Sequence, residues 1–124
     1  MLEIADSFFR IVSSNDWQEA QITGIVPKNA ADEKDGLIHV NQFIDLEKVC
    51  GERFVEQDYP IALEFAPDSY LDQLVWHDED EDTPWRDGQI SIDNLSADLV
   101  LRIYSFEHLS AKAGGAFKIL EESQ

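Results

Sequence analysis

The apolar residues of this chain fall in short runs, such as FFRIV at residues 8–12 and LIHV at residues 37–40. A helix that crosses a bilayer needs about 20 consecutive apolar residues, so runs of this length predict no transmembrane helix. The runs are rich in β-branched and aromatic residues and are bounded by Gly, Pro, Asn, Asp and Ser, which is typical of strands joined by turns. The chain is therefore expected to build its core largely from short strands.

The segments between the early strands predict two helices in the N-terminal half. The stretch SSND (residues 13–16) is a start signal for a helix over residues 14–23, which ends at Gly24. Asn41 can cap a second helix, in which one stripe is apolar (Phe43, Leu46, Val49, Cys50 and Phe54). Residues 25–36 are expected to form a short extended piece and then a polar loop.

Further strands are expected at residues 59–65, 74–77, 89–92 and 99–109. Strands that follow two early helices favour an α+β fold with a mixed, mainly antiparallel sheet. Residues 1–110 are assigned to a single α+β domain. Residues 111–124 are assigned to a loosely held C-terminal tail, with a short terminal helix as the alternative.

The charge balance limits the partners. The 124 residues include 26 Asp and Glu against 9 Lys and Arg, which gives a net charge of −17. A surface this negative repels phosphate backbones and anionic lipids, and no cluster of Lys and Arg marks a nucleic-acid footprint. We therefore expect neither a nucleic-acid duplex nor a membrane among the partners. The acidic surface either keeps the protein soluble or attracts a basic protein partner or cations.

The cysteine count and the first residues bear on the compartment. Cys50 is the single cysteine, which excludes an intrachain disulfide and suits a reducing interior. The first residues lack the basic start and the apolar stretch of a secretory signal. A cytoplasmic protein is expected.

Several standard sites are absent from the sequence. There is no glycine-rich phosphate loop, and one cysteine with three scattered histidines does not predict a zinc site. The acidic run at residues 78–82 has the alternate spacing of a calcium loop, but Thr83 stands where such a loop needs glycine and Gln89 where it needs a bidentate Glu. No metal site is predicted.

His39 is the first candidate for a functional residue. It lies between Ile38 and Val40 in an apolar run. A buried imidazole costs free energy unless both ring nitrogens find hydrogen-bond partners. His39 is therefore either a satisfied core histidine or the working group of a site.

Four further residues combine polar or aromatic chemistry with a strand or loop. Arg10 lies among apolar neighbours, so its guanidinium either pairs with a carboxylate or faces a ligand. Trp76 and His77 end a strand beside the acidic run, whose carboxylates favour the charged imidazole; plain surface exposure is the alternative for His77. Trp85 lies in a Pro-containing loop, as a lid over a site or as an anchor to the core.

Five stretches of the chain carry a family resemblance: FFRI (residues 8–11), WQEA (17–20), DGLIHVN (35–41), LVWH (74–77) and TPWRDGQI (83–90). In that order they resemble the motifs I-Y-K-I, W-x-x-A, D-G-F-I-H-L-S, L-x-W-E and F-P-H-I-Y-G-P-L. These motifs characterise small, mostly bacterial domains grouped as domain of unknown function 952. The similarity covers about residues 8–107.

This resemblance implies a fold similar to that of ADP-ribosyltransferases and RNA 2'-phosphotransferases. Their cleft holds NAD or an ADP-ribosylated phosphate. Carried onto matching positions, the resemblance implies catalytic roles for His39 and His77. It implies that four residues contact the nucleotide: Arg10, Asn41, Trp76 and Trp85. His77 stands where the family has Glu, and Asn41 stands where it has Ser.

Two functions follow from these patterns. The first is a small ADP-ribosyltransferase-like domain whose cleft binds NAD or a related nucleotide, and either processes it or has lost the chemistry. It requires Arg10, His39, Asn41 and Trp76 to line one cleft beneath Trp85. The second is a non-catalytic protein-interaction or regulatory domain that uses its acidic surface. Whether the chain is an enzyme stays open at this point.

Overall fold

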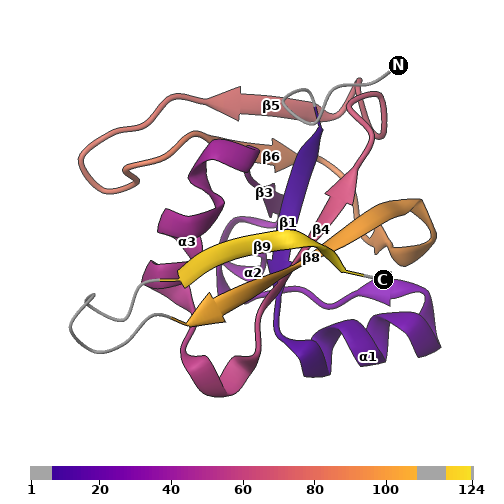
Figure 1. The fold of residues 1–124 in the computed structure, drawn as a ribbon. Coiled ribbons are helices and arrows are strands. Elements are labelled where there is room, and N and C mark those ends of the chain that lie inside the picture. The colour runs from indigo at the N-terminus through magenta and orange to yellow at the C-terminus, as the bar shows by residue number, and fades with distance from the viewer. Residues whose placement is uncertain (1–6, 109–116, 124) are drawn as a thin grey trace.

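The computed structural model describes residues 7–108 and 117–123, with side chains described as far as residue 120 (Figure 1). The chain forms an α+β fold in which every strand pairing among these residues is antiparallel. The strands are β1 (Phe8–Val12), β2 (Ile25–Val26), β3 (Ile38–Val40), β4 (Ile61–Phe65), β5 (Leu74–His77), β6 (Asp87–Ile90), β7 (Leu95–Ser96), β8 (Val100–His108) and β9 (Phe117–Ser123). The helices are α1 (Ser14–Thr23), α2 (Ala30–Asp35) and α3 (Leu46–Arg53), with short 3-10 turns η2 (Phe43–Asp45), η3 (Glu56–Asp58) and η4 (Ala97–Leu99).

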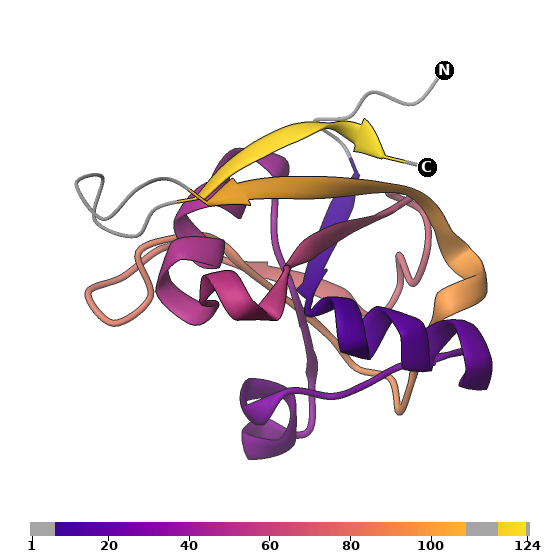
Figure 2. The ribbon, with the colours of Figure 1, turned by 60° about the horizontal axis from the view of Figure 1, so that its bottom comes forward.

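Two sheets meet at β1. The larger has the strand order β1-β4-β8-β9, and the smaller has the order β3-β6-β5. Phe9 and Asn41 join them by two backbone hydrogen bonds, with N···O distances of 2.8 and 2.7 Å. Figure 2 shows β8 and β9 along one side of the molecule and α1 and α2 on the other. The joint places β3, which carries His39, next to β1, which carries Arg10.

The neighbouring strands β1 and β4 are buried on both faces. Alternate residues enter two apolar clusters, of which one contains Phe8 and Phe65 and the other contains Phe9 and Ala62. The Phe8 and Phe65 rings stack at 5.1 Å between centroids. A strand covered on both faces needs no polar alternation, which explains the nearly continuous apolar run FFRIV. Arg10 is its single polar residue.

The predicted helix over residues 14–23 is confirmed as α1. The Ser13 hydroxyl accepts a hydrogen bond from the backbone N–H of Asp16, and Gly24 ends the helix with a φ of 83°. Both signals are local in the sequence, so they could be read without the rest of the fold.

The predicted polar loop before Gly36 is corrected by α2. Asn29 forms a capping box with Asp32, in which each side chain accepts from the other residue's backbone N–H. Gly36 then ends the helix with a φ of 76°. The fold therefore has three helices among its described residues rather than the two expected.

The predicted tail contributes a strand to the larger sheet. β9 pairs antiparallel with β8, so the alternative of a terminal helix is wrong. Phe117 is buried and Ile119 packs against the same apolar cluster, while the Ile119 N–H donates to Glu47 of α3 at 2.8 Å. Residues 109–116 lie outside the described part. Within the described residues, no helix has the length and apolar character needed to cross a bilayer.

Candidate functional site

His39 is held between two carboxylates. It lies in the middle of β3, and its side chain is 13% exposed. Its Nδ1 is 2.9 Å from Oδ2 of Asp87 on β6, and its Nε2 is 2.9 Å from Oδ2 of Asp35 at the end of α2. Asp87 is largely buried and Asp35 lies at the surface, so the ring is bonded from the interior on one side and at the surface on the other. Both ring nitrogens are therefore satisfied.

These contacts favour the charged imidazole. The hydrogen bond with Asp87 raises the pKa of His39 above its ordinary value of 6.5; burial opposes the shift, and Asp35 adds to it. Burial alone would raise the pKa of Asp87, but hydrogen bonds with His39 and Gln89 bring it below its ordinary value. The pKa of Asp35 is also lowered, since the hydrogen bonds from the Leu37 N–H and His39 outweigh its desolvation. The contacts of His39 therefore favour its charged form, in which each ring N–H faces a carboxylate.

Arg10 and Asp32 form a buried ion pair beneath this site. Arg10 is 3% exposed and Asp32 is 1% exposed. Nη1 donates to Asp32 Oδ1 at 3.0 Å and Nη2 donates to Oδ2. The same two nitrogens donate to the carbonyls of His39 (2.8 Å) and Pro27 (3.1 Å). Of the two alternatives for Arg10, the structure shows pairing with a carboxylate, and its nucleotide-binding role stays a prediction.

Asp32 organises the backbone around this pair. Its Oδ1 accepts from the His39 N–H at 2.9 Å, and its Oδ2 accepts from the Asn29 N–H at 3.0 Å. Burial would raise the pKa of Asp32, but Arg10 and these two backbone donors hold it below its ordinary value. One carboxylate thus ties β1, α2 and β3 together, which sets the position of His39.

A cleft opens beside His39. Its inner part is a cavity of about 20 Å³, which is enough for about one water molecule. The residues lining this cavity are Arg10, Ile11, Asn29, His39, Asn41, Val49, Arg53, Phe54 and Asp87. Its outer part is a groove of about 400 Å³ lined by Asn29, Ala30, Ala31, Arg53 and Phe54. Asn29, Arg53 and Phe54 line both parts, and we call the whole the His39 cleft.

The charges lining the His39 cleft nearly cancel. Arg53 and Asp87 line the cleft with opposite charges, His39 is paired with Asp87 and with Asp35 outside the lining, and Arg10 is neutralised by Asp32. This local balance differs from the whole chain, whose net charge is −17. An anionic ligand is therefore repelled less here than elsewhere on the surface.

The structure brings three of the six predicted site residues to this cleft. Arg10, His39 and Asn41 line its inner cavity. Asn41 does not cap a helix as expected, because its backbone pairs with Phe9 and α3 begins only at Leu46 after the 3-10 turn.

His77 lies on the same face of the small sheet as His39. It is exposed at the end of β5, and its register partner on β6 is Asp87. The catalytic roles predicted for His39 and His77 stay predictions. Asp87 lies between the two histidines on the shared face.

The two predicted tryptophans lie elsewhere. Trp76 points to the opposite face of the small sheet, where its ring covers Gly88 and lines a different groove. The requirement that Trp76 share a cleft with His39 is therefore not met. Trp85 is 5% exposed and packs in the cluster around Phe9, with the Arg53 guanidinium 5.3 Å from its ring centroid. Trp85 was expected to be either a lid over a site or an anchor to the core, and the structure shows the anchor.

Sequence reasoning missed the carboxylates of the site. Asp35 precedes His39 by four residues within DGLIHVN, and Asp87 lies within TPWRDGQI. The spacing of Asn29 and Asp32 was a readable capping signal. No local signal links Asp87 or Arg53 to His39, since those contacts depend on how the strands and α3 pack.

The comparisons with known proteins bear on the fold. No family model matches the chain, and no curated protein matches it. A crystal structure of protein CC0527 from Caulobacter crescentus has a TM-score of 0.74 at 20% sequence identity, over 90% of this chain and 93% of that chain. A solution NMR structure of CC0527 gives 0.69 at 21% identity, over 90% of both chains. The chain therefore shares its α+β fold with CC0527.

Proposed function

We propose that the chain is a small ADP-ribosyltransferase-like domain, of the kind grouped as domain of unknown function 952, and that its His39 cleft binds NAD or a related nucleotide. The observation that carries this proposal is the geometry of His39, whose ring is held from inside by Asp87 and bonded on its outward nitrogen by the surface carboxylate of Asp35. The similarity to CC0527 concerns the fold and carries no activity.

Asp35 occupies the place of a ligand anion. Its side chain is 40% exposed and accepts from His39 Nε2, which is the outward nitrogen of the ring. A phosphate oxygen of the nucleotide replaces this carboxylate in the bound state, because charge-assisted hydrogen bonds to an anion are among the strongest that an imidazolium makes. Arg53 supplies a second cation in the same cleft.

The outer groove suits the apolar part of a nucleotide. Phe54, Ala30 and Ala31 form its apolar wall, and its volume of about 400 Å³ falls in the range of roughly 300–1,000 Å³ typical of small-molecule sites. The base lies along this wall, with the aromatic ring of Phe54 as its main contact. The phosphates then point toward Arg53 and His39.

The chemistry of the cleft favours binding over proton abstraction. The contacts of His39 favour its charged form, which has no lone pair to accept a proton, so in that form the ring can act as a general acid but not as a general base. His77 occupies the position of the family's Glu, and Asp87 beside it is already bonded to His39 and Gln89. We therefore assign nucleotide binding as the function and leave group transfer outside the proposal.

The test is calorimetric titration of the purified chain with NAD, ADP-ribose and a 2'-phosphorylated oligoribonucleotide. Arg53→Gln is expected to weaken the binding of the preferred ligand about tenfold, since it removes a charged contact. Arg86→Gln is the matched control, because it removes the same charge at a residue that does not line the cleft.

Two results would overturn the proposal. One is the absence of heat or chemical-shift change with all three ligands at millimolar concentration. The other is equal weakening by Arg53→Gln and Arg86→Gln, which would mean non-specific attraction rather than a site. Tryptophan fluorescence gives a second readout, because Trp85 lies directly beneath Arg53.

A further inference from the structure

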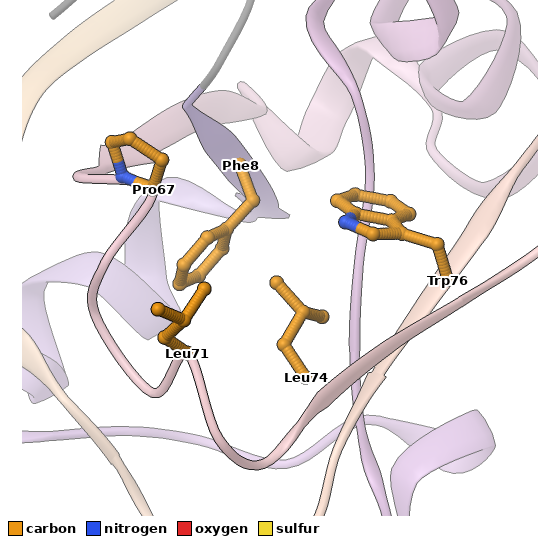
Figure 3. A pocket seen from close by; sticks show the side chains of 5 residues that line it. All are labelled: Phe8, Pro67, Leu71, Leu74 and Trp76. Atoms are coloured by element: carbon orange, nitrogen blue, oxygen red, sulfur yellow. The ribbon is translucent and has the colours of Figure 1, made fainter.

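A second groove lies on the other face of the small sheet. Its lining consists of Phe8, Pro67, Leu71, Leu74 and Trp76, and its volume is about 370 Å³. Figure 3 shows these side chains around a common space, with Trp76 on one side of Leu74 and Pro67, Phe8 and Leu71 on the other. We call it the β5 groove. It is separate from the His39 cleft, since none of the residues described in the structure lines both.

The described part of the chain leaves the β5 groove open. Leu71 is 64% exposed at its rim, and Leu74 and Trp76 are half-buried. Phe8 is fully buried and forms its floor against Phe65. An exposed leucine beside a half-buried tryptophan is apolar surface that a partner can cover at a gain in free energy.

The groove runs along an edge strand. β5 is the last strand of the order β3-β6-β5 among the described residues. The Gln73 carbonyl accepts from the Ser91 N–H at 3.2 Å and so faces the β6 side. Backbone groups alternate along a strand, so those of Leu74 and Trp76 face outward. The Leu74 N–H donates to the Tyr70 carbonyl, so with respect to residues 7–108 and 117–123 the open edge begins at the Leu74 carbonyl.

Side chains of an added strand would enter the groove in a fixed pattern. In an antiparallel pair, residues opposite one another project to the same face of the sheet. A segment paired with β5 would place its residues opposite Leu74 and Trp76 on the groove side. Alternate residues of that segment, at positions i and i+2, are therefore the ones that must be apolar.

Acidic residues flank the groove at both ends. Asp68 and Asp72 are exposed on the segment that carries Leu71. The acidic run at residues 78–82 follows β5 directly, and the Asp78 side chain is 93% exposed. Arg86 contributes a cation nearby, but it lies over the Trp76 ring and 3.5 Å from Asp78. The surroundings of the groove are thus negative, which complements a basic partner.

We propose that the β5 groove binds an extended segment of a partner protein, which adds to β5 as an antiparallel strand, inserts alternate apolar side chains between Leu71 and Trp76, and carries Lys or Arg on both flanks. The acidic flanks steer the segment to the groove, and the edge of β5 fixes its register. This function is independent of nucleotide binding in the His39 cleft.

The test uses the synthetic peptide KKLTLTLKK with the full chain, followed by calorimetry and by amide chemical shifts. Binding is expected with shifts at residues 71–77 and no shift at His39. Leu71→Ser is expected to weaken binding about tenfold, because it removes one apolar contact. Ile44→Ser is the matched control, since Ile44 is 85% exposed and does not line the groove.

Each control peptide separates one part of the proposal. KKSTSTSKK must bind more weakly, because it lacks the apolar side chains, and EELTLTLEE must bind more weakly, because its flanks are repelled. Equal binding of all three peptides, or equal loss in Leu71→Ser and Ile44→Ser, would overturn the proposal. Two further results would also overturn it. A dimer that forms through β5 would assign the groove to a second copy of the chain. Binding of the peptide only after removal of residues 1–6 would assign the groove to the chain's own N-terminus.

Discussion

Arg10 and Asp32 form a two-point ion pair in the interior, and the same carboxylate also accepts the backbone N–H groups of Asn29 and His39. Two charges this deeply buried are stable only while each keeps all of its partners. The pair therefore acts as the structural joint between β1, α2 and β3, and the position of the His39 cleft depends on it.

Asp32→Asn is expected to lower the free energy of unfolding by about 3–5 kcal/mol, because it leaves the Arg10 guanidinium buried without its counter-charge. The double variant Arg10→Met, Asp32→Leu should recover part of this loss, since it removes both charges but still orphans two backbone donors. Urea denaturation measures the free energy of unfolding of the wild type, of Asp32→Asn and of the double variant. Asp78→Asn is the control: it breaks an exposed pair with Arg86 and should change stability by at most about 1 kcal/mol. Equal effects of Asp32→Asn and Asp78→Asn would contradict this account.

Gly88 is required by the packing of Trp76. A Cβ at this position would lie 2.7 Å from Val40 Cγ2 and 2.8 Å from Trp76 Cζ3. Gly88→Ala should therefore cost about 1–3 kcal/mol, through displacement of the indole ring. Denaturation gives the energy, and the near-ultraviolet dichroism of the tryptophans reports the displaced ring. Wild-type stability with an unchanged spectrum would show that the sheet adjusts freely at this point.

The parts of the fold that sequence could predict are those set by local signals. Ser13 and Gly24 bound α1 by themselves, and the apolar stripe of Leu46, Val49 and Cys50 identifies the buried face of α3. β9 was missed because its signal is weak. Only Phe117 and Ile119 alternate as a buried strand requires, Leu120 interrupts the alternation, and residues 121–124 are polar.

The candidate site could be predicted only in part, because its partners are distant in the sequence. His39 and Arg10 were identified as polar residues within apolar strands. Their partners Asp87 and Asp32 are 48 and 22 residues away, so pairing depends on strand order and on the placement of α2. The prediction that Trp76 shares a cleft with His39 is wrong for a related reason. Alternation along β5 shows which residues share a face of the sheet, but it does not show which of the two faces is buried.

Cys50 is expected to be unreactive in the folded protein. It is fully buried on α3, and burial, with a smaller contribution from Asp58, raises the pKa of its thiol to about 12. The thiolate is the nucleophile, so this shift alone slows labelling roughly a thousandfold relative to an ordinary thiol. Labelling with a disulfide reagent across a urea series should follow the unfolding curve, and Cys50→Ser gives the background. Rapid labelling in buffer would mean that α3 opens locally.

The charge on His39 predicts a pH dependence of stability. The charged groups that contact the ring are Asp35 from α2 and Asp87 from β6, and Arg53 from α3 lines the same cavity. Because the folded-state pKa is raised above 6.5, the stabilisation is fully present below pH 6.5 and is lost as pH rises through the folded pKa.

The difference in unfolding free energy between wild type and His39→Gln should therefore shrink as pH rises above 6.5. Imidazole proton shifts in the wild type should titrate above 6.5. A constant difference between wild type and His39→Gln across this range would mean that the two carboxylates do not hold the ring in its charged form.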